Sequence, residues 1–178
     1  MYQEIIDFWF QEIEPAKWWV KDHDFDQLIR DKFLSTYNRA KTCELYTWRT
    51  SAKGRLAEVI ILDQFPRNMF RGRALSFATD PLALALSQEA ISIGADLELN
   101  SSEKSFLYMP FMHSESLEIH VQAVTLFKKC GNESNLKFEL RHKEIIETYG
   151  RYPHRNDILG RESRPEELVF LTQPGSGF

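Results

Sequence analysis

The chain has 178 residues, of which 43% are hydrophobic and 13% aromatic, and its formal net charge is −4. This length and this apolar content are sufficient for one domain with a sizeable core. The negative net charge excludes a global basic field that would attract nucleic acid or an anionic membrane surface.

The first residues of the chain and its two cysteines indicate the cellular compartment in which the protein is expected. Residues 1–7 lack the basic start and the apolar run of a secretory signal peptide. No apolar run in the sequence approaches the length that spans a bilayer. The two cysteines, Cys43 and Cys130, have neither the number of a disulfide framework nor the spacing of a metal site. We therefore expect a soluble protein of the reducing cytoplasm, with no membrane partner.

The first part of the chain predicts three helices. Residues 2–10 are rich in aromatic and aliphatic side chains and are followed by a proline. Asp24 then has the position of an N-cap, and apolar residues recur at helical spacing up to residue 40. Residues 55–65 are apolar nearly all round, which indicates a central buried helix that Pro66 is expected to end.

The rest of the chain predicts further helices that are separated by glycine or proline. Their expected ranges are 80–93, 102–109, 113–129, 134–149 and 166–172. No stretch shows the alternation of a β-strand bounded by hairpin turns. We therefore predict an all-α protein, a single domain over residues 1–178 with about eight antiparallel helices.

The segment 150–166 concentrates arginines among turn residues. It contains Arg151, Arg155, Arg161 and Arg164, together with His154 and Asn156. Its Tyr-Pro-His-Arg-Asn order echoes Phe-Pro-Arg-Asn at 65–68, and both stretches follow a predicted helix. Guanidinium forks match the geometry of carboxylate and phosphate groups. The same arginines could instead bind carbonyls at helix ends or pair with nearby carboxylates, and so join helices.

Four residues have the chemistry for acid–base catalysis. His113 and Glu115 lie at the start of the helix predicted from residue 113, His142 lies on the next helix, and His154 lies in the arginine segment. These residues could alternatively converge on a metal ion, although no local signature such as His-Glu-x-x-His supports a metal site. We therefore predict no metal and no other cofactor, and we keep the four residues as catalytic candidates.

Three long motifs follow one another in the chain: Leu-Asp-Gln-Phe-Pro-Arg-Asn-Met-Phe-Arg-Gly at 62–72, Phe-Leu-Tyr-Met-Pro-Phe-Met-His-Ser-Glu at 106–115, and Gly-Arg-Tyr-Pro-His-Arg-Asn-Asp-Ile-Leu-Gly-Arg at 150–161. In this order they resemble a bacterial family known as domain of unknown function family 924. The resemblance covers nearly the whole chain. It implies an all-helical fold similar to tetratricopeptide-like domains, and it implies no activity.

The chain departs from the family pattern at one place. The family usually shows Asp-Gln where this chain has Ile119-His120. The resemblance therefore leaves His113 and Glu115 better placed as site residues than His120.

We predict that polar residues of these motifs gather at helix ends and bind an anionic small molecule. The predicted ligand-binding residues are Asp63, Gln64, Arg67, Asn68, Arg151, His154, Arg155, Asn156 and Arg161. A protein or peptide interaction module is a second hypothesis, and a metal-dependent hydrolase is a third. Nucleic acid is not an expected partner, because the segment 150–166 has a charge of only +1. The sequence indicates neither an oligomeric state nor whether the protein is an enzyme.

Overall fold

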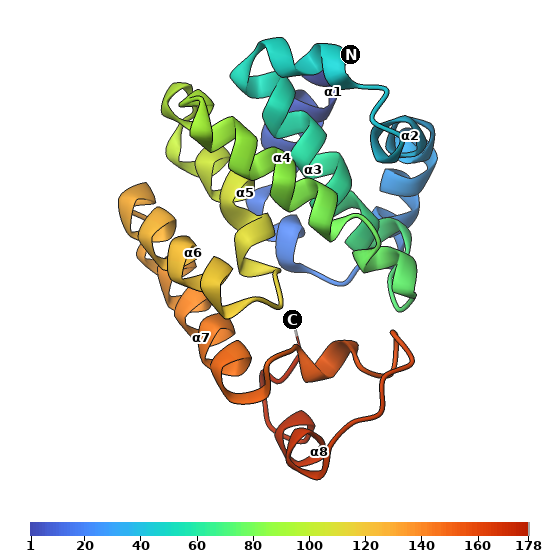
Figure 1. Cartoon of the computed structure of the whole chain (residues 1–178). Coiled ribbons are helices and arrows are strands. Elements are labelled where there is room, and N and C mark those ends of the chain that lie inside the picture. Colours follow the sequence, from blue (N-terminus) through green and yellow to red (C-terminus); the bar gives the residue numbers. More distant parts are fainter. Residues whose placement is uncertain (178) are drawn as a thin grey trace.

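Helix α3 (Ala52–Met69) lies at the centre of the computed structural model, which describes residues 1–177 (Figure 1). It contacts α1 (Tyr2–Asp7), α2 (His23–Lys41), α4 (Asp80–Ser92) and α5 (Ser101–Met112). Because neighbours cover it on all sides, every residue from Leu56 to Pro66 is buried. The prediction of a central helix that is apolar nearly all round is confirmed.

The second half of the fold continues from α5. Helices α6 (Leu117–Cys130) and α7 (Glu133–Tyr149) run antiparallel beside each other, and α8 (Pro165–Leu171) follows near the C-terminus (Figure 1). A π-helical turn extends α1, and short 3₁₀ turns lie between the longer helices; these segments are Phe8–Glu12, Pro15–Trp19, Tyr46–Thr50, Ala74–Phe77, Ala95–Glu98 and Pro153–Arg155.

The predicted all-α class with about eight helices is confirmed, since residues 1–177 contain eight α-helices and no strand. The tetratricopeptide-like arrangement stays a prediction. Within this part of the chain, no helix has both the length and the apolar character needed to cross a membrane.

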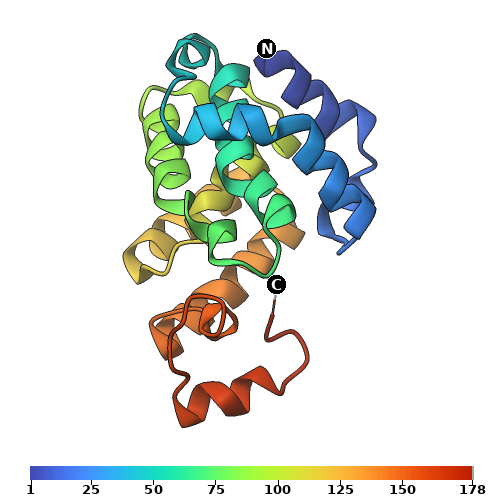
Figure 2. The same ribbon diagram turned by 90° about the vertical axis from the view of Figure 1, so that its right-hand side faces the viewer.

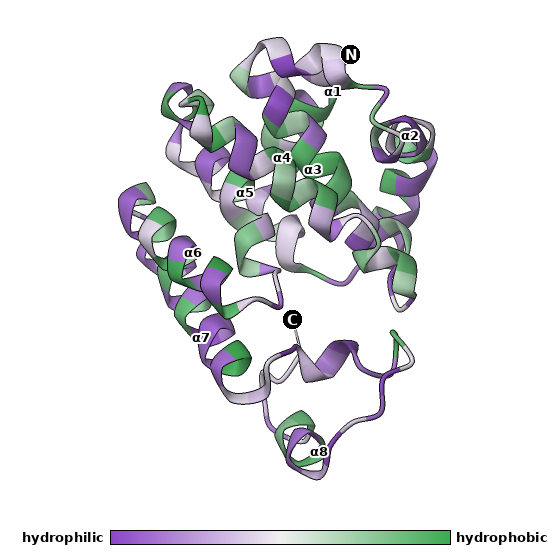
Figure 3. Cartoon of the chain, viewed as in Figure 1, coloured by the Kyte–Doolittle hydropathy of each residue, from purple (hydrophilic) through white to green (hydrophobic). Residues whose placement is uncertain are grey.

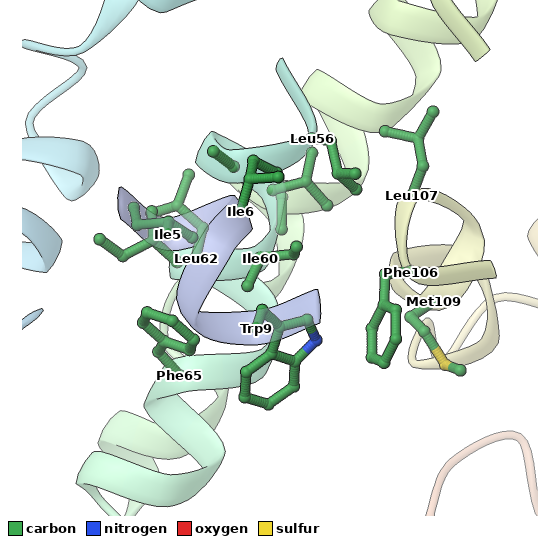
Figure 4. Close-up of a cluster of buried hydrophobic side chains, with 14 of the residues drawn as sticks. Ile5, Ile6, Trp9, Leu56, Ile60, Leu62, Phe65, Phe106, Leu107 and Met109 are labelled. Atoms are coloured by element: carbon green, nitrogen blue, oxygen red, sulfur yellow. The ribbon is translucent and has the colours of Figure 1, made fainter. Parts of the chain in front are cut away.

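The main core joins the first helical turns to α3 and α5. Trp9 packs edge-to-face on Phe65 of α3, with 5.4 Å between ring centroids, and on Phe106 of α5, with 5.6 Å. Figure 4 shows these rings together with Ile5, Ile60 and other aliphatic side chains. The ribbon of α3 is accordingly coloured largely as hydrophobic in Figure 3. Removal of this apolar surface from water is the dominant force that holds the helices together.

The chain after α7, which we call the C-terminal segment, shares only a small apolar cluster with the end of α7. Ile145 and Ile146 of α7 and Tyr152 form this cluster, and Tyr149 and Phe170 pack against it. Figures 1 and 2 show that the chain after α7 forms one end of the molecule, with α8 farthest from α3. Polar contacts must therefore contribute much of the attachment of this segment to the rest of the fold.

Two helices continue through prolines, so the predicted ends at Pro66 and Pro110 are wrong. In α3, Pro66 cannot donate to the carbonyl of Leu62, four residues earlier. The hydroxyl of Thr79 donates to that carbonyl instead, at 2.6 Å. In α5, the hydroxyl of Ser87 on α4 donates to the carbonyl of Leu107, in the turn before Pro110. Hydroxyl groups from other segments thus satisfy carbonyls near each proline.

Two other predicted boundaries also differ from the structure. His113 does not begin a helix but is the C-cap of α5, and α6 begins at Leu117 after the N-cap Ser116. Asp22, not Asp24, caps α2, because its carboxylate accepts hydrogen bonds from the backbone N–H groups of residues 24 and 25. His113 is therefore fixed to the C-terminal end of α5.

Gly54 provides a test of the tight packing at the start of α3. A Cβ at this position would lie 2.0 Å from the carbonyl oxygen of Trp48. Gly54→Ala should therefore lower the free energy of unfolding by about 1–3 kcal/mol, despite the better helix propensity of alanine. Thermal unfolding measures this loss. Gly177→Ala is the control, because nothing lies within 4 Å of its added Cβ; equal melting temperatures for the two variants would contradict the packing argument.

Candidate functional site

Two arginines from distant parts of the chain meet at Asp80, the first residue of α4. Arg67 of α3 forms a two-pronged ion pair with the carboxylate of Asp80, with N···O distances of 2.9 and 3.0 Å. Arg155 donates to the same carboxylate from Nη1 at 3.3 Å. The two Pro-Arg-Asn stretches of the sequence therefore converge at their arginines.

Arg155 is held between aromatic rings. Its guanidinium carbon lies 4.5 Å from the ring centroid of Phe77 and 4.7 Å from that of Tyr152. Only 7% of the residue is exposed, and its Nε has no hydrogen-bond partner among residues 1–177. Arg155 thus keeps a donor that its single bond to Asp80 does not use.

Asp63 and His113 form a pair next to these arginines. Oδ1 of Asp63 lies 2.8 Å from Nδ1 of His113, and Oδ2 accepts a hydrogen bond from the side-chain amide of Gln64 at 2.5 Å. Burial acts to raise the pKa of Asp63, but the His113 ring and the charge of Arg67 bring this pKa down to about 2. Asp63 is therefore ionised at neutral pH, and His113 donates to it from Nδ1.

The environment of His113 keeps the ring neutral. Burial lowers the pKa of His113, and the nearby charge of Arg67 lowers it further, although Asp63 opposes both effects. The side chain remains 16% exposed. With Nδ1 donating to Asp63, the lone pair of the ring is on Nε2, which is the arrangement of a general base oriented by a carboxylate.

Three further histidines surround Tyr152. The ring centroids of His154, His142 and His120 lie 5.6, 5.7 and 6.2 Å from that of Tyr152. Burial lowers the pKa of His142 to about 3. Burial and the charge of Arg155 lower the pKa of His154 to about 4. Both rings are therefore neutral at physiological pH.

His120 belongs to a fully buried network. Its Nδ1 lies 2.8 Å from Oε1 of Glu139, and its Nε2 lies 2.9 Å from the carbonyl oxygen of Ser114. Both ring nitrogens face acceptors, so either the ring carries two protons or Glu139 carries one. Burial raises the pKa of Glu139 although His120 opposes the effect, so one proton shared within the pair fits this geometry. The network joins α6 to α7.

The other predicted ligand-binding residues lie in separate ion-pair groups. Asn68 donates to Asp26 of α2 at 2.8 Å. Arg151 forms a two-pronged pair with the buried Glu167, at 2.7 Å for both bonds. Asn156 donates to the same carboxylate at 3.2 Å. The side chains of these residues thus bind carboxylates and join helices, which is the structural alternative to anion binding that the sequence leaves open.

Glu115 and Arg161 form a further group. Arg161 donates to both carboxylate oxygens of Glu115, at 2.7 and 2.9 Å, and the backbone N–H of Tyr152 donates to Oε1 at 2.8 Å. Partial burial acts to raise the pKa of Glu115, but these bonds bring it below its usual range. Glu115 is therefore an ionised anchor for the segment after α7.

The predicted residues do not assemble a metal site. Among residues 1–177, no group of three or more histidine, cysteine, aspartate or glutamate side chains is arranged to hold a metal ion. His113, His142 and His154 influence one another electrostatically, but Glu115 is occupied by Arg161.

Sequence reasoning missed several residues that organise the site. Asp80-Pro81 predicts only a helix start, with Asp80 as the N-cap; in the structure Thr79 is the N-cap, and the carboxylate of Asp80 is bound by both arginines. Glu167 and Tyr152 were not selected at all, although the first receives Arg151 and the second packs on Arg155. The Asp-Pro pair at residues 80 and 81 is a local capping signal, and it carries no information about distant arginines.

The buried histidines generate a pH prediction. The pKa values of His142 and His154 are below the unfolded value of 6.5, so their contribution to stability is complete above pH 6.5 and is lost as the pH falls toward about 3 for His142 and about 4 for His154. Unfolding free energy measured by urea titration should therefore fall between pH 6.5 and pH 4. His142→Gln should reduce this slope by about 1.4 kcal/mol per pH unit.

The control for this prediction is His23→Gln, at a side chain that is 93% exposed. This variant should keep the wild-type slope. A slope that is unchanged in His142→Gln would show that His142 is not held neutral by the fold.

Comparisons with known proteins agree on one family. The model of the family described as "Bacterial protein of unknown function (DUF924)" matches residues 5–175. A solved structure of a protein of unknown function from Agrobacterium tumefaciens is 40% identical, with a TM-score of 0.91 and 96% of each chain covered. No curated protein matches the chain. The family match over nearly the whole chain and the similar fold agree with the three sequence motifs, and the chain therefore belongs to this family of bacterial proteins of unknown function.

Proposed function

We propose that the protein binds a small molecule with a carboxylate or phosphate group at Arg67 and Arg155, where His113 accepts or donates a proton. The single observation that carries this proposal is the meeting of the two guanidinium groups at Asp80 beside the Asp63–His113 pair. We also propose the cytoplasm as its location, as the sequence predicts.

The charges of the groups around Asp80 favour the binding of an anion together with the uptake of a proton. Arg67 and Arg155 are balanced by Asp63 and Asp80 as long as His113 is neutral. An anion bound beside His113 would raise the pKa of the ring, because a negative charge favours the imidazolium. Proton uptake and anion binding then strengthen each other.

Each residue has a distinct proposed role. The partly exposed side chain of Arg67, with Arg155 beside it on Asp80, would bind the anionic group of the ligand. Asp63 orients His113 and stabilises its protonated form, as the carboxylate does in other carboxylate–histidine pairs. Phe77 and Tyr152 hold Arg155 in place, so that less side-chain entropy is lost when an anion binds.

Sulfate is a suitable probe because its charge does not change near neutral pH. Isothermal titration should detect saturable sulfate binding that tightens as the pH falls from 8 to 6. Arg155→Met should weaken binding at least tenfold, as expected for the loss of a charged hydrogen bond worth about 1.5–3 kcal/mol. His113→Gln should keep some binding but lose its pH dependence.

Two variants make this experiment decisive. Arg155→Lys keeps the positive charge without the fork, so it should bind sulfate weakly while its helical circular dichroism is that of the wild type. Arg39→Met changes an exposed arginine that pairs with Glu44, and it should bind sulfate as the wild type does. Absence of saturable binding to the wild type, or equal binding by Arg155→Met, would disprove the proposal.

A further inference from the structure

Two hollows lie one after the other along α2, and the first of them is lined by Thr79, the residue before Asp80. The first has a volume of about 510 Å³, the second has a volume of about 390 Å³, and Phe70 lines both. Helix α2 forms one wall of each hollow, and the chain from Asn68 to Thr79 forms the opposite wall. Figure 2 shows α2 lengthwise in front of α3. Because Phe70 lines both hollows, we describe them together as the α2 groove.

The α2 groove follows the length of the helix. The residues that line it on this side run from His23 of α2 to Thr42, just after the helix, and they recur at intervals of three and four, so they share one face. At a rise of 1.5 Å per residue this face is roughly 28 Å long. An extended peptide of about eight residues has the same length, at about 3.3 Å per residue.

One end of the α2 groove is basic. Arg30, Arg71 and Arg73 line the second hollow, and Asp26 is the carboxylate among them. Arg71 forms a two-pronged pair with Asp26, with distances of 2.5 and 2.6 Å. Arg30 donates to the carbonyl of Met69 at 2.8 Å. The side chain of Arg73 is exposed and has no hydrogen bond or ion pair to any residue that the structure describes.

The sign of this charge is opposite to that of the whole protein. Three arginines against one aspartate leave a local charge of +2, whereas the chain has a net charge of −4. Since Arg30 and Arg73 have no carboxylate partner, an anionic group can approach them without displacing an existing ion pair. The basic end of the α2 groove therefore suits an acidic side chain.

The other end of the α2 groove is mostly apolar, although Lys41 also lines it. Tyr37 and Phe70 are nearly buried and pack on each other, with 5.4 Å between their ring centroids. Leu34 and Leu75 also line this hollow, and Leu75 is 50% exposed. A leucine that is half exposed beside two aromatic rings can bury further surface only when another molecule covers it.

We propose that the α2 groove binds an extended peptide segment of a partner protein, with an acidic residue against Arg30 and Arg73 and a large apolar residue against Phe70 and Leu75. The partner's acidic and apolar residues lie about five positions apart, because the two halves of the α2 wall are centred roughly 17 Å from each other. A drug-sized ligand is usually enclosed over most of its surface, whereas a long groove along a helix has the form used by peptide-binding proteins. This function is separate from anion binding at Asp80.

A selection from a displayed library of random nonapeptides tests the proposal. Wild-type protein should enrich sequences with Asp or Glu about five positions from Leu, Phe, Ile or Met. A fluorescein-labelled peptide synthesised from the selection should bind with a Kd that rises as NaCl increases from 50 to 300 mM. Arg73→Glu and Leu75→Glu should each weaken this binding at least tenfold, and both changes are at exposed positions where the fold should tolerate them.

Matched controls lie on α2 outside the groove. Arg39→Glu makes the same charge change as Arg73→Glu, and Leu28→Glu, at a leucine that is 48% exposed, makes the same change as Leu75→Glu. Both should bind the peptide as the wild type does. Arg155→Met should also bind it normally, so a failure of the Asp80 site would not affect this result.

Three outcomes would overturn the proposal. The first is a library that shows no enrichment over a blank support. The second is a selected peptide that binds Arg73→Glu and Leu75→Glu as tightly as the wild type. The third is saturable binding of dodecyl phosphate that both groove variants abolish, with no peptide enriched, because the groove would then take a small amphiphile and not a peptide.

Discussion

The C-terminal end of α3 lies inside the protein, and every polar group at that end therefore needs a protein partner. An unpaired buried carbonyl or carboxylate would cost about as much as a lost hydrogen bond or more. The partners come from segments that are distant in sequence: Thr79 for the carbonyl of Leu62, His113 for Asp63, and Asp80 for Arg67. The start of α4 and the end of α5 are positioned where these bonds require them.

The same requirement extends to the C-terminal segment. Arg155 brings this segment to Asp80, Arg161 brings it to Glu115, and Arg151 joins its two ends through Glu167. Removal of one partner from a buried pair costs about 3–5 kcal/mol, whereas the intact pair adds little net stability. These pairs therefore determine where the segment lies more than how stable the protein is. The proposed anion site rests on one of these pairs, because Arg155 shares the carboxylate of Asp80 with Arg67 of α3.

Much of the helical framework could be predicted from local patterns. The apolar run before Asp63 indicates the buried α3, and the glycines that the sequence places between helices include Gly131 and Gly150, which end α6 and α7 with positive φ angles. Pro66 misled the prediction because the hydroxyl that satisfies the freed carbonyl lies 17 residues away in sequence. A partner so distant in sequence cannot be predicted from the residues around Pro66.

The site was predictable in residue types but not in pairings. The motifs contain Asp63, Arg67, His113 and Arg155, and these four do meet. Asn68, Arg151, Asn156 and Arg161 come from the same motifs, yet they bind other carboxylates. The pairing of arginines with carboxylates depends on how the ends of α3, α4 and α5 are arranged in space. The helical periodicity of the sequence does not predict that arrangement.

The small apolar cluster of the C-terminal segment has a consequence for motion. Ile145, Ile146 and Tyr152 form a core that is separate from the main one, and separately packed motifs often unfold locally as cooperative units. Opening would carry Arg155 away from Asp80 but leave Asp63 and His113 in contact. In the proposed function, the Asp63–His113 pair would stay with α3 and α5, whereas the contact between Arg155 and Asp80 would depend on how the C-terminal segment docks.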